Sequence, residues 1–338
     1  MSMRTVVIRK VTNATITILI ILVANFVLFR LLPGDPAVNF LRSGGAHSTD
    51  PDLIARQREI FGLTDPPLVQ LGKYLVNTVT GNWGYSFYQG DLLVTELLAQ
   101  KAVWTIVLVG TSTIITIWIG IIIGAAAAWR RGKAFDVASL GFGFFFYAMP
   151  TYWLGIVLII IFQEQIGLIP ILPSAHSLPI PGDADYPIGR LPTLFETLVG
   201  GFQHWILPAL TLTLVQLAGI SLIMRNSLID VLTEDYVITA RAKGLSDRMV
   251  LRRHAMPNAR LPMVTVIALN LGFILGGAIQ VESIFSYDGL GNLTVTAVQD
   301  KDFPVMQGLF LLITISVVIA NLVSDFVYAW LDPRVRLE

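Results

Sequence analysis

Residues 103–129 read VWTIVLVGTSTIITIWIGIIIGAAAAW, an apolar run of 27 residues without a charged side chain. A helix needs about 20 consecutive, mostly apolar residues to cross the hydrocarbon core of a bilayer. The run is long enough for that, and it ends in the basic turn RRGK at 130–133, whose charges belong in water. This stretch therefore predicts a transmembrane helix.

The composition of the whole chain indicates a membrane protein. Of the 338 residues, 54% are hydrophobic and only 14% are charged, against about 45–50% and about 25% in soluble domains. Basic and acidic residues number 23 each, so the net charge gives no reason to expect a nucleic-acid partner. The chain has no cysteine, which excludes disulfides, thiolate metal sites and cysteine nucleophiles, and its four histidines lack metal-ligand spacing.

Further apolar runs predict an all-α, polytopic fold with six transmembrane helices. They cover residues 14–32, 103–129, 137–162, 205–228, 263–285 and 305–331. The first run follows Arg4, Arg9 and Lys10, as the apolar part of a cleavable signal peptide would. It is too long for that, and no small-x-small cleavage site follows it, so we interpret it as an anchored helix.

The distribution of Lys and Arg predicts the orientation. If the N-terminus is cytoplasmic, 15 of the 23 Lys and Arg lie in cytoplasmic segments and 7 in outer segments, with Arg30 inside the first helix. An excess of Lys and Arg in cytoplasmic loops is the usual bias of membrane proteins. We therefore expect a multi-pass protein of the inner membrane with both termini in the cytoplasm.

The predicted helices divide the chain into three parts. Residues 1–102 comprise the first helix and an extracytoplasmic segment, in which 50–63 and 68–79 favour short helices. Residues 103–331 form a core of five helices, and 332–338 a cytoplasmic tail. Six prolines within 167–203 favour an irregular external loop over another helix.

The cytoplasmic segment 230–262, DVLTEDYVITARAKGLSDRMVLRRHAMPNARLP, has an ordered layout. A first helix is expected over 230–243, ending at Gly244, because glycine is a common helix stop. Ser246 is a favourable N-cap for a second helix, and Pro257 is expected to end it, because proline disfavours helix at the residue before it.

The second helix of this segment is basic on one side, through Arg248, Arg252 and Arg253. A solvated loop of the positive-inside kind would share these charges. It would not need the helix, cap and stop signals that accompany them. A short amphipathic helix that projects from a membrane domain can instead dock in a groove of a cytoplasmic partner.

Part of this segment is similar to a known motif. The sequence TARAKG at 239–244, followed after nine residues by HAMP at 254–257, resembles the EAA loop of ABC importer permeases. That loop reads Glu-Ala-Ala, three residues, Gly, nine residues, Ile-x-Leu-Pro; this chain has Ile238 at the glutamate position. The segment is closer to the peptide/nickel branch of the family, whose loop reads Thr-Ala-x-Ala-Lys-Gly-Leu followed by Arg-His.

Other motifs resemble, in chain order, the first permease subunit of dipeptide and oligopeptide transporters. They are LPGDP at 32–36, GNWGYS at 81–86, MPTYWLG at 149–155, VESIFSYDGLG at 281–291 and LDPRVR at 331–336. Asp288 stands where the family has proline, and the proline-rich loop at 167–203 is longer than usual. The resemblance covers nearly the whole chain.

The resemblance implies a type I ABC importer permease fold and a subunit that forms half of the translocation pathway for di- and oligopeptides. It further implies a homologous second permease subunit, two ATP-binding subunits and an extracytoplasmic substrate-binding protein as partners in the lipid bilayer. The residues that would couple this chain to the ATPases are Ala240, Lys243, Gly244, Ser246, Arg248, Arg252, Arg253 and Pro257.

The chain itself has no catalytic signature. It has no Gly-x4-Gly-Lys-Ser/Thr loop to hold phosphates, and no paired carboxylates or Ser/His/Asp arrangement can be named. We therefore expect no enzymatic activity, metal or cofactor in this subunit, with ATP and Mg²⁺ bound by the partner ATPases.

Polar residues in or near the predicted helices are candidates for lining the pathway or for packing. Glu282 and Asp325 lie near helix ends, where water is close, and we favour capping or packing for both. Asn270 and Gln280 are expected to form hydrogen bonds between helices. The same architecture would also suit oligosaccharides or nickel chelates. An ion-coupled secondary transporter would favour acids at mid-membrane and repeated halves, which are not visible here.

Overall fold

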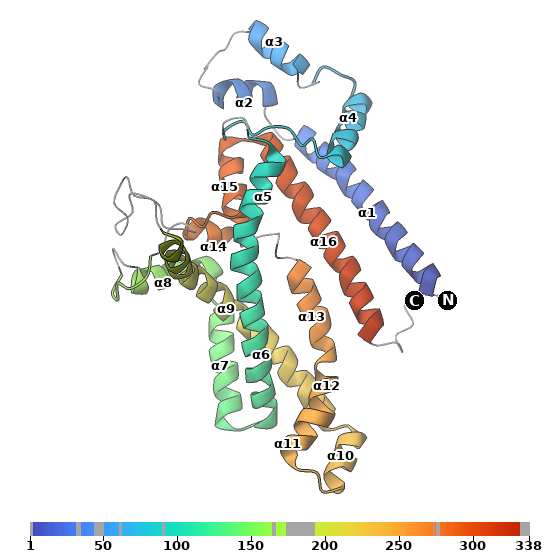
Figure 1. Cartoon of the computed structure of the whole chain (residues 1–338), viewed down its shortest axis with the longest axis vertical. Helices are drawn as coiled ribbons and strands as arrows, with labels where there is room; N and C mark the ends of the chain where they lie inside the picture. The colour runs from blue at the N-terminus through green and yellow to red at the C-terminus, as the bar shows by residue number, and fades with distance from the viewer. Residues whose placement is uncertain are drawn as a thin grey trace.

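The computed structural model of the chain (Figure 1) is helical, as predicted. Apart from two isolated β-bridges, the regular structure of the described part of the chain consists of helices. The described residues are 3–31, 35–43, 51–60, 63–89, 92–163, 167–173, 193–272, 274 and 278–331.

Four helical segments are long and apolar enough to cross a membrane within the described ranges. They are α1 (Met3–Leu31), the continuous α5 (Val94–Thr105), η1 (Ile106–Gly110) and α6 (Thr111–Trp129), then α9 (Leu194–Leu232) and α16 (Phe303–Leu331). The second of these begins at Val94, nine residues before the predicted start. Runs of apolar residues thus predicted the spanning helices but not their full lengths.

The predicted run 137–162 is not one straight helix. It forms α7 (Ala134–Tyr147) and α8 (Thr151–Phe162), which meet at an angle of 98°. Pro150 lies between them with a non-helical ψ of 131°, and proline disfavours helix at the residue before it. The bend is therefore a local consequence of the proline.

The predicted run 263–285 is also interrupted. It comprises α13 (Leu261–Gly272) and α14 (Ile279–Ile284), and positions 273 and 275–277 between them lie outside the described residues. With four spanning helices and one bent pair, the count of six membrane spans stays a prediction.

The expected irregular loop over 167–203 is wrong for its last ten residues, because α9 begins at Leu194. Thr193 caps this helix: its side chain accepts a hydrogen bond from the Glu196 N–H, and the Glu196 carboxylate accepts one from the Thr193 N–H. This reciprocal pair is a capping box. Residues 174–192 of the predicted loop lie outside the described ranges.

The outer segment contains the two short helices that were predicted and one that was not. α3 (Pro51–Ile60) and α4 (Pro67–Thr80) correspond to the expected helices over 50–63 and 68–79. Gly81 ends α4 in the left-handed conformation, with φ of 77°. The additional helix is α2 (Pro36–Ser43).

The packing of α6 against α9 forms the centre of the molecule, and glycines make it possible. A Cβ atom added at Gly120 would lie 2.6 Å from Cγ2 of Ile220, and one at Gly124 would lie 2.3 Å from the carbonyl oxygen of Ser221. Small residues at such positions let helix backbones approach closely in membranes. The two helices are therefore in direct backbone contact.

An ion pair fixes α7 to α9. Arg225 donates from Nε to Oδ1 of Asp136 at 2.6 Å and from Nη2 to Oδ2 at 2.8 Å. The N–H of Gly132 donates to the same carboxylate at 2.9 Å. Asp136 is buried, so this bidentate pair holds α7, α9 and the turn after α6 together.

The remaining elements lie at the two ends of the central helices. Figure 1 shows α10 (Asp235–Ala242), α11 (Asp247–Met249) and α12 (Met256–Ala259) at one end, and α2, α3 and α15 (Leu290–Asp300) toward the other. We call residues 235–259, which include α10–α12, the tip. We call residues 279–306, which comprise α14, α15 and the first turn of α16, the outer end.

Candidate coupling tip and central cavity

The tip is built from short helices at the place predicted from the sequence. They are α10 (Asp235–Ala242), α11 (Asp247–Met249), the π-helical η2 (Val250–Ala255) and α12 (Met256–Ala259). The predicted first helix over 230–243 is wrong at its start, because residues 230–232 are the last turn of α9. The break at Thr233 and Glu234 separates the tip from that helix.

Gly244 is the helix stop that the sequence predicted. Its φ of +77° lies in the left-handed region that favours glycine. The N–H of Gly244 donates to the carbonyl of Arg241, and the N–H of Leu245 to that of Ala240. These two bonds form a Schellman motif, which satisfies carbonyls that the helix end leaves open.

Two other expectations for the tip need correction. Ser246 occupies the N-cap position, but its side chain makes no capping hydrogen bond. Its carbonyl instead accepts the N–H groups of Met249 and Val250. Pro257 does not end the second helix, because it lies in the first turn of α12, where a missing N–H is tolerated, and the π-helical η2 before it accommodates the ring.

The inner face of the tip is apolar and buried. Val237, Ala240 and Val250 pack together, so α10 lies against η2. Ala255 and Ala259 join a second cluster in which the main partners are Met224 and Leu228 of α9, Ala128 of α6 and Met263 of α13. Ser227 also donates to the carbonyl of Ala259 at 2.8 Å. The tip is thus firmly attached to α9.

The outer face of the tip is basic. Of the predicted coupling residues, Ala240 is buried in the first cluster, and the rest are exposed: Lys243, Gly244, Ser246, Arg248, Arg252, Arg253 and Pro257. Arg241 makes a contact that was not predicted from the sequence. Its guanidinium lies 5.7 Å from the ring centre of Trp129 at the end of α6. The tip therefore has a basic outer surface and a buried apolar inner face that packs against α9.

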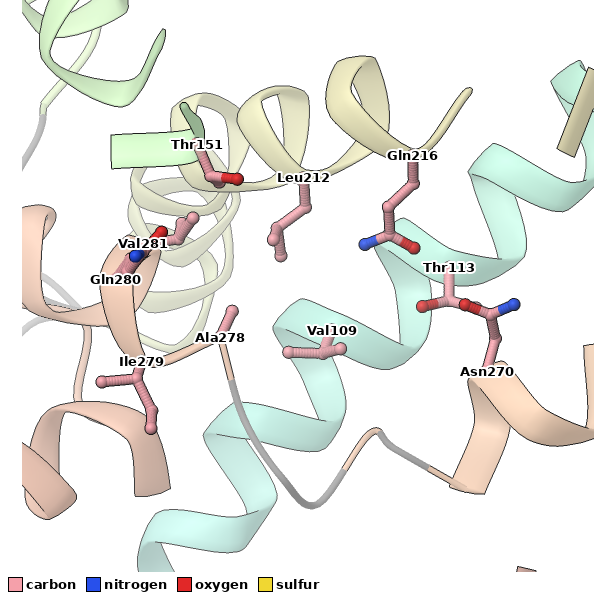
Figure 2. Close-up of a pocket in the computed structure, with 10 residues that line it drawn as sticks. All are labelled: Val109, Thr113, Thr151, Leu212, Gln216, Asn270, Ala278, Ile279, Gln280 and Val281. Atoms are coloured by element: carbon pink, nitrogen blue, oxygen red, sulfur yellow. The ribbon is translucent and has the colours of Figure 1, made fainter. Parts of the chain in front are cut away.

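A cavity of about 400 Å³ lies near the middle of the helix bundle (Figure 2). Six elements line it, namely η1, α6, α8, α9, α13 and α14 with its N-cap residue, and each of the ten lining residues is uncharged. They are Val109, Thr113, Thr151, Leu212, Gln216, Asn270, Ala278, Ile279, Gln280 and Val281.

Side-chain amides and hydroxyls supply the polar part of this central cavity. Figure 2 shows the Gln216 side chain extending from α9 toward α6, the helix that carries Thr113. Asn270 and Gln280, both predicted as pathway or packing candidates, line the cavity. The hydrogen bond of Asn270 was expected to join two helices, but its amide donates to the carbonyl of Val266 in its own helix at 2.8 Å.

Glu282 does not line the central cavity. Its side chain is fully buried, so the expectation of nearby water is wrong. The carboxylate accepts the N–H of Gly291 at 2.6 Å, the N–H of Asn292 at 3.2 Å and the hydroxyl of Thr105 at 3.0 Å. Because Gly291 and Asn292 are in the first turn of α15 (Leu290–Asp300), Glu282 caps that helix, as favoured from the sequence.

Thr105 is the partner that the sequence did not indicate. Its hydroxyl oxygen accepts the N–H of Leu290 at 2.7 Å while it donates to Glu282. A Cβ atom at Gly289 would lie 2.4 Å from the Glu282 carboxylate. The glycines of the motif at 281–291 therefore leave room for this carboxylate. Asp325 lies in the last part of α16, whose side chains are outside the described part of the structure.

A second buried carboxylate joins the outer end to residues 81–89. Asp302 accepts the hydroxyl of Ser86 at 2.5 Å and the N–H of Phe87 at 3.0 Å. Burial raises the pKa of Asp302 above the ordinary value of an aspartate. The serine belongs to the predicted motif GNWGYS, so this contact gives that motif a structural role.

Comparison with known proteins identifies relatives along the chain. Residues 120–337 match the family described as binding-protein-dependent transport system inner membrane component, and residues 3–115 match its N-terminal counterpart. A putative peptide transport system permease protein of Brucella abortus is 34% identical over 336 residues, covering 99% of this chain and 100% of the relative.

Two further relatives have similar coverage. The oligopeptide transport system permease protein AppB of Bacillus subtilis is 32% identical over 336 residues, covering 98% of each chain. The glutathione transport system permease protein GsiC of Salmonella paratyphi A is 34% identical over 332 residues, covering 98% of this chain and 99% of the relative. These matches confirm the resemblance that the sequence motifs indicated.

Proposed function

This chain belongs to the family of binding-protein-dependent transport system inner membrane components, and we propose that it forms half of the translocation pathway of an ATP-driven peptide importer. As a member of the family it is a non-catalytic, multi-pass subunit of the inner membrane. Such a subunit works with ATPase and substrate-binding partners.

The observation that carries the proposal is the uncharged polar lining of the central cavity. The amides of Gln216, Asn270 and Gln280 come from three helices, and each carries both a donor and an acceptor. Peptide bonds carry the same two groups. A lining of this kind can accept the backbone of a peptide without a fixed charge that selects for its side chains.

The tip supports the second part of the proposal, the coupling to ATPases. Its basic outer face would dock on one of two ATP-binding subunits, which hold ATP and Mg²⁺. Its buried inner face would pass their movement to α9, because Ala255 and Ala259 pack on Met224 and Leu228. A homologous second permease would supply the other half of the pathway, and an extracytoplasmic binding protein would deliver the peptide.

The same assignment sets the orientation in the membrane. The tip would face the cytoplasm together with both termini, in accord with the excess of Lys and Arg in the segments on that side. The helices α2–α4 would then lie on the outer side, where a substrate-binding protein approaches.

The test is charge reversal on the tip in the assembled transporter. We expect Arg252→Glu with Arg253→Glu to reduce peptide-stimulated ATP hydrolysis and peptide uptake in proteoliposomes at least about 10-fold, because like charges at a docking surface cost several kcal/mol. Arg9→Glu with Lys133→Glu is the control, because these exposed cations lie outside the tip.

Unchanged assembly, hydrolysis and uptake in the tip variant would contradict the coupling role. Uptake that followed a proton gradient and ignored ATP would contradict the importer itself. The purified chain alone is expected to show no ATP hydrolysis.

A further inference from the structure

The apolar side of α4 is exposed. Leu68 and Val79 are each 82% exposed, and Val69 and Val76 are 46% and 61% exposed. At 3.6 residues per turn, these four positions fall within an arc of about 100° around the helix axis. A Cβ atom at Gly72, in the same arc, would meet no atom within 4 Å. We call residues 68, 69, 72, 76 and 79 the α4 stripe.

The side of α4 that faces the protein is polar. Gln70 is buried, and its amide donates to the carbonyls of Leu63 at 3.1 Å and Asp65 at 2.7 Å. The hydroxyl of Tyr74 accepts a hydrogen bond from the Asn25 amide at 3.0 Å. A helix on the surface of a water-soluble domain has the reverse arrangement, with its apolar face toward the core. The orientation of α4 therefore indicates apolar surroundings.

Contacts with α1 place α4 at the depth of the membrane boundary. Tyr74 touches α1 inside its spanning window, Ile8–Arg30, through the Asn25 hydrogen bond and a ring contact of 5.7 Å with Phe26. At 1.5 Å per residue, Asn25 lies about 8 Å before Arg30 along α1. Amphipathic helices bind membranes at this level, with their apolar faces about 5–10 Å into the boundary between head groups and acyl chains.

The surface of α1 beside this contact is also exposed and apolar. Only 11% of the spanning window of α1 is buried, and Val23, Val27 and Leu28, which flank the contact with Tyr74, are exposed. Figure 1 shows α1 and α4 together on the side of the molecule away from α7 and α8. The lipid that surrounds α1 in a bilayer is therefore the apolar material nearest to the α4 stripe.

Charge is kept away from the α4 stripe. Lys73 is the one charged residue in the sequence of α4. It forms an ion pair at 2.6 Å with Asp65, which precedes the helix. Since a charge in the hydrocarbon of a bilayer is costly, this pairing suits a helix whose apolar side contacts lipid.

We propose that α4 is an interfacial helix, in which Leu68, Val69, Val76 and Val79 contact the acyl chains of the bilayer where the α1 span ends. The occupant of the α4 stripe is lipid and not a protein partner. The contact anchors the segment between α1 and α5 at the membrane surface. It is separate from the central cavity, so its test does not rely on transport.

The experiment measures the depth of nitroxide labels on the full chain in proteoliposomes of phosphatidylcholine and phosphatidylglycerol. The chain has no cysteine, so Val76→Cys and Val79→Cys each give one label on the α4 stripe. The readout is the ratio of collisions with O₂, which concentrates in the bilayer, to collisions with a nickel chelate, which stays in water.

Two positions of the same chain calibrate this ratio. Ile20→Cys, 63% exposed at the middle of the α1 window, is the lipid reference, and Lys133→Cys, exposed in the turn after α6, is the water reference. We expect ratios at Val76→Cys and Val79→Cys that are several-fold above the water reference and below the lipid reference, as the boundary of the bilayer requires.

The matched control is Asn77→Cys, because Asn77 is exposed next to Val76 but lies outside the α4 stripe. Its ratio should be lower than that of Val76→Cys. A second variant weakens the contact itself: Leu68→Ser with Val79→Ser should lower the ratio of a label at Val76→Cys. Both serines replace exposed side chains, so the unfolding temperature in detergent should stay that of the wild type, which separates lost lipid contact from misfolding.

Three results would overturn the proposal. One is a ratio at Val76→Cys and Val79→Cys equal to the water reference. Another is an equal ratio at Val76→Cys and Asn77→Cys. The third is a loss of O₂ collisions at the α4 stripe when the complete transporter is assembled, which would show that a protein partner covers it.

Discussion

Both the tip and the outer end bury apolar side chains, but the two regions differ in where their charged side chains lie. At the tip, apolar side chains such as Val237 and Val250 are buried, and Arg252 and Arg253 are exposed. At the outer end, the carboxylates of Glu282 and Asp302 are buried and accept hydrogen bonds from the backbone. The charged side chains of the tip are thus accessible to a partner, whereas those of the outer end form hydrogen bonds within the fold.

The largest effect on stability is expected from Glu282→Ala. It leaves the N–H groups of Gly291 and Asn292 and the hydroxyl of Thr105 buried without their acceptor. We expect a loss of about 3 kcal/mol in the free energy of unfolding, measured by thermal unfolding in detergent. Asp300→Ala on the exposed end of α15 is the control, and equal losses in the two variants would break the comparison.

The second largest effect is expected between the two regions, where α6 meets α9. Gly124→Ala brings a methyl group against the Ser221 carbonyl and should destabilise the chain by about 1–3 kcal/mol. Gly219→Ala, on α9, meets no atom within 4 Å and should stabilise it by up to about 1 kcal/mol through helix propensity. The unfolding temperatures of the two variants test this contact. A lower value for Gly124→Ala than for Gly219→Ala would show that close backbone contact between α6 and α9 joins the two ends.

A smaller effect should appear on changing the pH. The pKa of Asp302 is raised by burial, so its ionisation costs more in the folded state than in the unfolded state. This penalty is present in full above the folded pKa and disappears as the pH falls below the unfolded one. Relative to Asp302→Asn, the wild type should therefore gain stability from pH 7 to pH 4. A loss of stability from pH 7 to pH 4, relative to Asp302→Asn, would show that the fold stabilises the carboxylate as an anion.

The smallest effect on stability is expected from the charge reversals at the tip. Arg252→Glu with Arg253→Glu changes exposed side chains only and should shift the free energy of unfolding by less than about 0.5 kcal/mol. Thermal unfolding of the purified chain checks this. A larger loss would mean that the basic face also supports the fold, and would remove the contrast with the outer end.

The sequence predicted the features that depend on neighbouring residues. Apolar runs located the spanning helices, and Gly244 ended its helix as expected. Two further features also have local signals in the sequence: Pro150 bends the third apolar run, and the Thr193–Glu196 capping box starts α9 before the predicted helix.

Features that depend on tertiary contacts could not be predicted. Thr105 and Glu282 are 177 residues apart in sequence, so no pattern connects them. Asn270 and Gln280 were candidates because they are polar. Gln216 was not a candidate, since the residues around it in α9 are mostly apolar. Which side of α9 faces the cavity depends on how the other helices pack against it.

The central claim is that the tip moves the helices around the central cavity, and single-cysteine labelling tests it most directly. The chain contains no cysteine, so Gln216→Cys introduces one thiol at the cavity. In the assembled transporter, we predict that its labelling rate by a hydrophilic maleimide changes when ATP and Mg²⁺ are added. The change should vanish when Arg252→Glu and Arg253→Glu are also present. A labelling rate that ignores ATP, or an ATP response that survives the charge reversals, would contradict the account.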